Sequence, residues 1–225
     1  MARTTKAHEE RRAEFLEAAR ELFYRHGYSD TSVAVIIDHI GVSKGTFYHY
    51  FESKEDLLDQ MVEQSTSEAA TILQSILDET DTTALDQFNQ LFRRATHWKA
   101  EHKDLIMMML HALYRDENLL LRHKMFKRSV AATTPTLAEI IRRGMAEGTM
   151  QTRYPAETAE WIMELGIILN EKVAGIILAG EGQPETYQQV EHWFTVYERK
   201  VEKMIGAKDG SLEIFDRSEL REFLS

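Results

Sequence analysis

The sequence predicts an all-α protein, in which an N-terminal three-helix unit with a helix-turn-helix precedes a larger C-terminal helical region. Three observations support this prediction. Apolar residues recur three and four positions apart along most of the 225 residues, which is the spacing of one face of an α-helix. The chain has only 3 prolines, the residue that interrupts helices most strongly. We find no run in which apolar and polar residues alternate as in a half-buried strand.

The first part of the chain predicts an arm followed by one helix. We expect residues 1–10 to form a flexible, solvated arm. From Arg11 to His26 the apolar residues share one helical face, and Gly27 is a typical stop. This face consists of Phe15, Ala18, Ala19, Leu22 and Phe23.

A short amphipathic helix is predicted next. Either Thr31 or Ser32 can cap its N-terminus, because both side chains carry a hydroxyl that can accept a backbone N–H. Gly41 can end it, since glycine adopts the left-handed conformation common after a helix. Its apolar positions follow the spacing i, i+3, i+4, i+7: Val33, Ile36, Ile37 and Ile40.

A second short helix follows the glycine turn. Ser43 can cap it, and Phe47 and Phe51, four positions apart, would face inward. Small, cationic and hydrogen-bonding side chains would then point away from the core. Such an exposed helix after a tight turn is typical of the recognition element of a helix-turn-helix. The outward residues are Lys44, Thr46, Tyr48 and His49.

The residues around this turn match a known signature over about residues 11 to 60. They are Ala18-Ala19, Leu22-Phe23, Gly27-Tyr28, Thr31, Ile36, Gly41-Val42-Ser43-Lys44-Gly45-Thr46-Phe47-Tyr48-His49-Tyr50-Phe51 and Ser53-Lys54-Glu55-Asp56-Leu57-Leu58. This pattern resembles the DNA-binding region of the tetracycline-repressor (TetR) family. Ile37-Asp38-His39 stands where the family often carries small residues, a departure that affects packing more than identity.

The resemblance implies that this region contacts a double-stranded DNA operator. Lys44 lies where a cation can meet guanine O6 and N7, and a phosphate contact is the open alternative. Gly45 would let the backbone approach DNA closely. By resemblance, Thr31, Tyr48 and Lys54 would bind phosphates. The expected DNA-binding residues are Thr31, Ser32, Ser43, Lys44, Gly45, Thr46, Tyr48, His49, Tyr50 and Lys54.

The rest of the chain predicts further helices and a second domain. Ser53 and Asp56 resemble a capping box that opens a helix toward about Leu77. Pro135 is expected to bend or break one of the later helices. We expect a helix-turn-helix domain over 1–55 and a ligand-binding and dimerisation domain over 56–225. The other expected helices cover approximately 85–101, 105–114, 119–148, 155–179, 187–204 and 216–224.

A pocket for a small apolar or amphipathic effector is implied by the resemblance. Met107-Met108-Met109 is more often a core run than a ligand site, yet soft methionines beside aromatic residues suit an adaptable cavity. The candidate ligand-binding residues are Trp98, Met108, His111, Tyr114, Trp161 and Glu164.

A homodimer is also implied by the resemblance, through the last two long helices. Both helices carry more apolar residues than one flank could bury. The residues that we expect at this interface are Ile162, Ile176, Ile177, Trp193, Phe194 and Tyr197.

Two readings from other classes remain open. Gly41-Val42-Ser43-Lys44-Gly45 matches G-x-S-x-G, the nucleophile elbow of α/β-hydrolases. That elbow needs a strand before the serine, whereas the residues before Gly41 have helical periodicity, so we expect no catalytic residue and no enzyme. The second alternative is a helical enzyme or small-molecule binding protein that keeps a vestigial DNA-binding head.

Composition limits the remaining classes. The net charge is −10, but residues 1–50 hold seven basic and seven acidic residues, so the acidity lies in the rest of the chain. The chain has no cysteine, no apolar signal segment and no pair of histidines four residues apart. Charged residues interrupt the longest apolar stretch, 161–179. We therefore expect a cytoplasmic protein without a membrane span, metal or cofactor.

Overall fold

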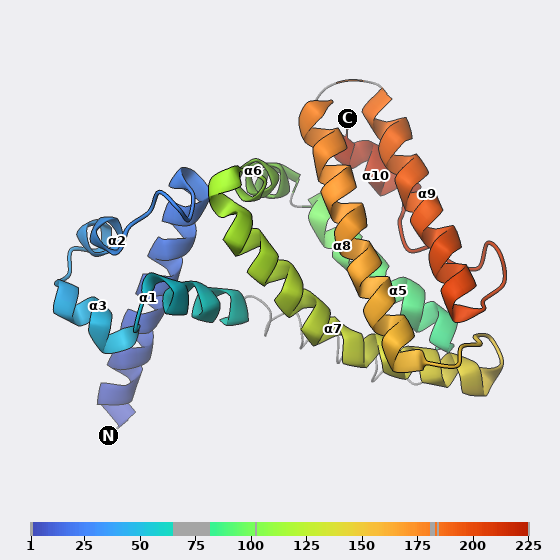
Figure 1. Ribbon diagram of the computed structural model, residues 1–225, viewed down its shortest axis with the longest axis horizontal. Helices are drawn as coiled ribbons and strands as arrows, with labels where there is room; N and C mark the ends of the chain where they lie inside the picture. Colours follow the sequence, from blue (N-terminus) through green and yellow to red (C-terminus); the bar gives the residue numbers. More distant parts are fainter. Residues whose placement is uncertain (1, 65–81, 102, 181–182, 184, 225) are drawn as a thin grey trace. The chain divides into compact units, whose positions relative to one another are not determined.

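The computed structural model describes residues 2–64, 82–101, 103–180, 183 and 185–224, and Figure 1 shows the helices that they form. Every regular element in these ranges is helical, which confirms the all-α prediction. The labelled elements are α1 (Ala2–His26), α2 (Val33–Ile40), α3 (Lys44–Tyr50), α5 (Ala84–Glu101), α6 (Lys103–Leu113), η1 (Asp116–Asn118), α7 (Leu119–Glu147), α8 (Pro155–Ala179), α9 (Glu185–Ile205) and α10 (Arg217–Leu224), with a further helix over 54–64.

The chain packs into two compact units, each of which combines two separate stretches of the sequence. Unit 1 consists of residues 1–67 and 108–128, and unit 2 consists of residues 68–107 and 129–225. The start of α7 therefore belongs to unit 1 although it follows α5 in sequence. The expected domain boundary after residue 55 stays a prediction.

Helix α1 starts earlier than the sequence pattern indicated. It begins at Ala2, so the expectation of a flexible arm over residues 1–10 is wrong. The chain has no glycine or proline before Gly27, and nothing in the sequence of the arm therefore interrupts helical hydrogen bonding. The helix ends at Gly27, whose φ of +94° is a conformation that glycine adopts without strain.

Unit 1 has one apolar core. The predicted stripe of α1 is buried in it, and so are side chains from α2, α3 and the helix over 54–64. Leu121 of α7, which is fully buried, joins the same cluster from far along the chain. The other members are Phe15, Leu16, Ala19, Leu22, Phe23, Tyr28, Ile36, Phe47, Phe51, Leu57, Leu58, Met61 and Val62.

Asn118 connects three parts of unit 1 from a fully buried position. Its amide nitrogen donates to the carbonyl oxygens of Phe23 at 3.1 Å and Ala112 at 2.9 Å. Its Oδ1 accepts the N–H of Tyr28 at 2.6 Å. One side chain thus satisfies backbone groups at the end of α1, in the following turn and in α6, each of which would be costly to leave unpaired.

Lys124 fastens α7 to the helix over 54–64 within unit 1. Its Nζ lies 2.8 Å from Oε1 of Glu55 and 2.7 Å from Oδ1 of Asp59. Partial burial lowers the pKa of Lys124, but the hydrogen bonds and charges of Asp59 and Glu55 together outweigh it, so the pKa is raised.

Unit 2 is built around α8 and α9, which lie side by side in an antiparallel pair. Tyr197 of α9 is buried and donates its hydroxyl to the carbonyl oxygen of Ile162 at 3.0 Å. Ile162 and Ile177 of α8 are buried as well. These three residues are therefore buried within the chain, and the expectation that they form a dimer interface is wrong.

Helix α7 continues through Pro135, so the helix is not broken there, and the alternative of a bend stays a prediction. Proline removes one helical N–H, and beside it the hydroxyl of Thr134 donates to the carbonyl of Val130 at 2.7 Å. The predicted end of this helix near residue 148 is confirmed, because Gly148 has a φ of +75° and follows the last helical residue. None of the helices in the described ranges has a stretch long and apolar enough to cross a bilayer.

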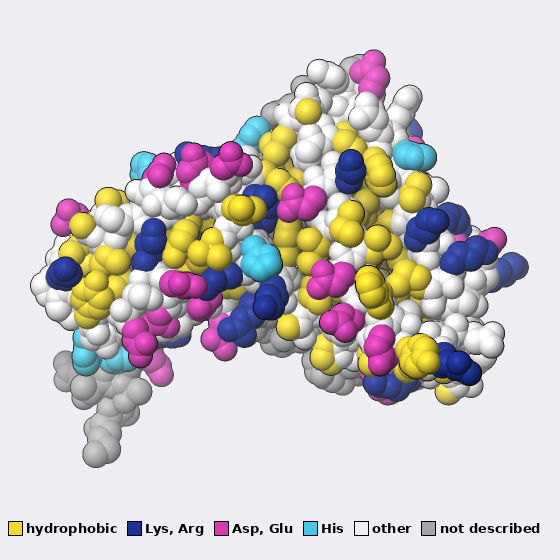
Figure 2. All heavy atoms as spheres, in the orientation of Figure 1, with side chains coloured by type: hydrophobic (Ala, Val, Ile, Leu, Met, Phe, Trp, Pro, Cys, Tyr) yellow, Lys and Arg dark blue, Asp and Glu magenta, His cyan; other side chains and the backbone are white. Residues whose placement is uncertain are grey.

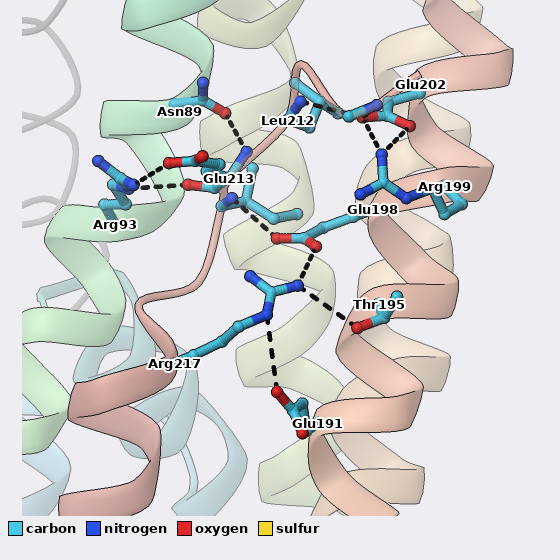
Figure 3. Close-up of polar contacts among 12 residues, drawn as sticks. Asn89, Arg93, Glu191, Thr195, Glu198, Arg199, Glu202, Leu212, Glu213 and Arg217 are labelled. Atoms are coloured by element: carbon cyan, nitrogen blue, oxygen red, sulfur yellow. Dashed lines mark hydrogen bonds and ion pairs between the residues drawn. The ribbon is translucent and has the colours of Figure 1, made fainter.

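The segment between α9 and α10 is held by two buried glutamates of α9 (Figure 3). Glu202 accepts the N–H groups of Gly210 at 2.9 Å and Leu212 at 3.0 Å. Glu198 accepts the N–H of Ile214 at 3.1 Å and faces the guanidinium of Arg217. The short final helix predicted over 216–224 is confirmed as α10, which packs against α9 and α5.

Candidate nucleic-acid interface

Capping residues fix the two helices on either side of the glycine turn. Ser32 caps α2, since its hydroxyl accepts the N–H of Val35 at 3.3 Å, and this settles the choice between Thr31 and Ser32. Gly41 ends α2 with a φ of +77° and donates its N–H to the carbonyl of Ile37. Ser43 then caps α3 by accepting the N–H of Thr46 at 3.2 Å. Each cap satisfies backbone groups that a short helix otherwise leaves unpaired.

The inward face of α3 is aromatic, as the spacing predicted. Phe47 and Phe51 are buried, at 0% and 1% exposed. Both rings pack against Phe15 of α1, with centroid distances of 5.7 Å and 5.6 Å and nearly perpendicular planes. Such edge-to-face pairs stabilise by about 0.5–1.5 kcal/mol each beyond their burial. The contact fixes the rotation of α3 about its axis and so decides which side chains face outward.

The outward face of α3 presents side chains that can bind a nucleic acid. Lys44 and His49 are exposed, and Tyr48 is 50% exposed. Gly45 is also exposed, so a ligand can approach the backbone closely. Thr46 is half-buried and shares a hydrogen bond of 2.9 Å with the hydroxyl of Ser43. Together they offer a cation, hydroxyls and an imidazole, the groups that contact phosphates and base edges.

Thr31 occupies a different place from the other candidates. It is fully buried, and its hydroxyl donates to the carbonyl oxygen of Gly27 at 2.8 Å. In this position Thr31 holds the end of α1 and the turn after it, and it does not present its hydroxyl to a phosphate.

Lys54 lies in the first turn of the helix over 54–64, and its side chain reaches the chain turn that follows α1. Its Nζ donates to the carbonyl oxygen of Tyr28 at 2.8 Å and lies 4.2 Å from the centroid of the Tyr28 ring. Partial burial lowers the pKa of Lys54, and nearby Asp30 opposes that effect. Because an ammonium group has three donors, this bond leaves others for an anion.

His8 belongs to the surroundings of α3, although the sequence pattern did not reveal it. Its ring centroid lies 4.5 Å from that of Tyr50 and 5.7 Å from that of His49. Tyr50 itself is half-buried and packs against Phe15 at 5.7 Å. His8 precedes Phe15 by seven residues, two helical turns, so an uninterrupted α1 would have placed both on one face. Because residues 1–10 were expected to form a flexible arm, the contact of His8 with α3 was not predicted.

The structure divides the candidate effector residues between the two units. Met108, His111 and Tyr114 belong to unit 1, whereas Trp161 and Glu164 belong to unit 2. Met108 is 53% exposed and Trp161 is 68% exposed. The side chain of Trp98 lies outside the described residues. The predicted effector site therefore stays a prediction.

Unit 2 has a cavity of about 510 Å³ on the surface of α8 and α9. It shares no residue with the candidate effector site. Its lining consists of Glu171, Lys172, Gly175, Ile176, Ala179, Gly180, Gln183, Thr186 and Gln189. Within the described part of the chain, no three metal-ligating side chains lie together as a metal site would require.

The fold and the capped, outward-facing α3 define a helix-turn-helix protein with a helical C-terminal region. Residues 15–61 match the family model described as bacterial regulatory proteins, tetR family. Over these residues, the helix-turn-helix region of the chain belongs to the tetR family of bacterial regulatory proteins. The matched residues include α2, the glycine turn, α3 and the outward side chains described above.

Curated relatives share the N-terminal part of the chain. The HTH-type transcriptional repressor KstR2 of Mycolicibacterium smegmatis is 32% identical over 107 residues, which are 48% of this chain and 49% of the relative. The uncharacterized HTH-type transcriptional regulator YuxN of Bacillus subtilis is 37% identical over 98 residues, which are 42% of this chain and 32% of the relative. The chain thus spans half or less of the length of these relatives.

Solved structures share the fold over most of the chain. A tetR-family transcriptional regulator from Pectobacterium atrosepticum has a TM-score of 0.63 and 21% identity, covering 88% of this chain and 95% of the other. The regulator FadR of Bacillus subtilis, solved in complex with stearoyl-CoA, has a TM-score of 0.59 and 20% identity, covering 84% and 97%. At these identities the likeness shows the fold alone.

Proposed function

We propose that the protein is a cytoplasmic, sequence-specific transcriptional repressor that binds operator DNA through α3 as a homodimer. The observation that carries the proposal is the outward face of α3. Lys44, Gly45 and Tyr48 are exposed there, while Phe47 and Phe51 fix the helix to the core from behind. A short, rigidly held helix with cationic and hydroxyl groups on its free face suits the major groove of DNA.

The charge distribution supports specific over non-specific binding. Residues 1–50 are neutral overall, and the remaining residues carry the whole net charge of −10. Affinity would then depend on a few local contacts from α3 and the caps, while the acidic part of the chain repels DNA elsewhere. Ser32, Ser43, Lys44, Gly45, Thr46, Tyr48, His49, Tyr50 and Lys54 are the proposed contact residues.

A homodimer would read a near-palindromic operator. Two copies related by a two-fold axis present two α3 helices, so the half-sites should be separated by about one helical turn of DNA or a multiple of it.

We further propose that a small apolar or amphipathic effector releases the protein from DNA. FadR, which has this fold, was solved with stearoyl-CoA, so the fold can hold an amphipathic molecule. Coupling requires that the effector bind the DNA-free form more tightly. A difference of about 1–3 kcal/mol would change operator affinity roughly 5- to 150-fold.

Selection of bound sequences from random duplex DNA tests the proposal. We expect an enriched near-palindrome, and its retardation in a gel should be abolished by competitor of the same sequence but not by scrambled DNA. A thermal-shift screen for ligands, followed by operator release, tests the effector. A ligand that stabilises the protein without changing DNA affinity would show that the coupling is wrong.

The alternative is a helical enzyme or small-molecule binding protein whose DNA-binding head is vestigial. Regulators of this family are generally non-enzymatic. The surroundings of the serine in the G-x-S-x-G motif also argue against an enzyme here. Ser43 follows a helix and caps another one, so it lacks the strand that a nucleophile elbow requires. A hydrolysis screen beside the DNA-retardation assay separates the two functions, since a vestigial head would select no sequence.

A further inference from the structure

Two imidazole rings lie together beside α3. His8 of α1 and His49 of α3 have ring centroids 5.7 Å apart, with planes at 76° to each other. Both side chains are exposed. Figure 2 shows histidine side chains close together at this edge of unit 1. Because His49 belongs to the outward face of α3, the pair borders the surface that we propose to meet DNA.

Tyr50 holds the two imidazoles near each other. Its ring centroid lies 4.5 Å from that of His8 and 5.1 Å from that of His49. Tyr50 is half-buried and packs at 5.7 Å against Phe15, which is fully buried. A cation within about 6 Å of an aromatic centroid is attracted to the ring. The Tyr50 ring therefore supports a positive charge on the imidazole of His8, and Phe15 anchors that ring to the core.

The charged groups around the pair leave both imidazoles available to an anion. Neither imidazole forms an ion pair with a carboxylate in the described part of the chain. On α1, Arg11 pairs with Glu14 at 2.5 Å, and Nε of Arg12 donates to Oε1 of Gln60 at 2.8 Å. On the helix over 54–64, the carboxylate of Asp56 accepts from Gln60 at 2.9 Å. The nearby carboxylates thus have other partners, and two arginines add positive charge on the same part of α1.

Two imidazoles at this separation can bind one anion jointly. Protonated imidazoles repel each other, and a phosphate between them replaces the repulsion with two attractions. Charge-assisted N–H···O bonds to phosphate oxygens are about 2.7–2.9 Å long, so two rings with centroids less than about 6 Å apart can both reach the oxygen atoms of one phosphate.

We propose that His8 and His49 together bind one backbone phosphate of the operator, so that the complex takes up protons as it forms. This inference rests on the proposed function, DNA binding through α3, and adds to it a contact from α1. It also makes the contact sensitive to pH, because histidine is the side chain that ordinarily changes its charge between pH 5 and 8.

The sign of the pH dependence follows from the charge of the phosphate. A phosphate binds imidazolium more tightly than neutral imidazole, and the two binding equilibria are reciprocally coupled. Lowering the pH from 8 to 6 therefore favours the complex. We expect operator affinity to rise about tenfold over this range, measured by fluorescence anisotropy of the full chain with the selected operator at constant ionic strength.

Substitutions of His8 separate its charge from its ring. His8→Phe keeps an aromatic ring against Tyr50 but removes both N–H groups, so most of the pH dependence should disappear. His8→Lys keeps a cation throughout this range, so it should bind the operator more tightly than the unmodified chain at pH 8. His26→Gln is the matched control, because His26 is exposed about 27 Å further along α1 and should leave the pH dependence unchanged.

A shared phosphate has further signatures. At pH 6, His8→Phe should lower the slope of log affinity against log salt by about one unit. It should weaken the operator and its single-base variants by the same factor, because phosphates carry no sequence information. His49→Gln should cause a similar loss, and the double variant should lose little more than either single variant. Thermal unfolding checks that each variant remains folded.

The outcomes distinguish this inference from the proposed function. If the chain selects an operator, but His8→Phe and His26→Gln keep the same pH dependence, the histidine pair does not bind a phosphate and the DNA-binding function stands. If the unmodified chain selects no sequence at either pH, the proposed function is wrong and this inference is wrong with it.

Discussion

Glu198 and Arg217 form an ion pair in which Nη2 of the arginine lies 2.8 Å from Oε2 of a fully buried carboxylate. The other oxygen of Glu198 accepts the N–H of Ile214. Glu198 and Glu191 both raise the pKa of Arg217, and partial burial opposes them. The pair fixes the start of α10 to α9 (Figure 3).

Arg217→Ala is expected to destabilise the protein, because it leaves the charge of Glu198 buried with one partner fewer. Arg217 is 40% exposed, so water can replace part of its contact, and we expect a loss of about 1–3 kcal/mol in the free energy of unfolding. Urea denaturation measures this value. Lys203→Ala is the control, because both side chains of the Lys203–Asp209 ion pair are exposed. An equal loss in both variants would mean that burial of Glu198 is not the cause.

Lys44→Ala should weaken operator binding and relax the preference at one base pair. A bidentate contact with guanine contributes about 1–3 kcal/mol of discrimination. Titration of the operator and of its single-base variants measures this change. If affinity for all duplexes falls equally, Lys44 contacts a phosphate instead.

Lys54→Ala should weaken binding to every duplex almost alike, since its proposed contact is a phosphate. The slope of log affinity against log salt should fall by about one unit. The variant also loses the bond to the carbonyl of Tyr28, so its melting temperature should fall. A lower melting temperature with an unchanged salt slope would show that Lys54 only supports the turn.

Gly27→Ala should destabilise the protein more than Gly41→Ala. Both glycines have positive φ, and an alanine costs about 1–2 kcal/mol in that conformation. At Gly41 the new Cβ would meet nothing within 4 Å, whereas at Gly27 it would lie 2.8 Å from the Cβ of Glu117. We expect this overlap to add roughly 1–3 kcal/mol, measured by chemical denaturation. Equal losses would indicate that the chain around Glu117 moves freely.

His97 should keep its proton to a higher pH than an ordinary histidine. Its Nδ1 lies 2.7 Å from Glu219 of α10, and this hydrogen bond, followed by the charge of Glu101, raises its pKa above 6.5. A raised pKa in the folded state adds stability that is fully present below the pKa of the unfolded chain and is lost as the pH rises through the folded value. Titration of the imidazole by NMR measures the pKa, and Glu219→Gln should lower it.

Local patterns were enough to predict most of the fold. The spacing of Phe47 and Phe51 gave the inward face of α3, because two residues four apart in a helix must share a face. Ser43 and Gly41 marked the ends of helices through backbone chemistry that involves only neighbouring residues. The outward face of α3 followed from these features.

Contacts between distant segments could not be predicted in this way. Thr31 is a hydroxyl residue in a turn, and only the packed structure shows that it is buried and donates its hydroxyl to the carbonyl of Gly27. Similarly, Lys54 donates a hydrogen bond to the carbonyl of Tyr28, which lies 26 residues earlier in the sequence. On α8 the periodicity identified an apolar helix but did not show which side faces the core, so Ile162, which is buried, was expected at an interface.

The three hydrogen bonds of Asn118 have a consequence for folding during synthesis and for the design of chimeric proteins. The N-terminal helices cannot complete their hydrogen bonding or their core until Asn118 and Leu121 have been synthesised. A ribosome must therefore translate more than half of the chain before unit 1 can finish folding. For the same reason, a chimera that exchanges only residues 1–55 would carry an incomplete unit 1, whereas one that transfers both 1–67 and 108–128 would carry the whole of it.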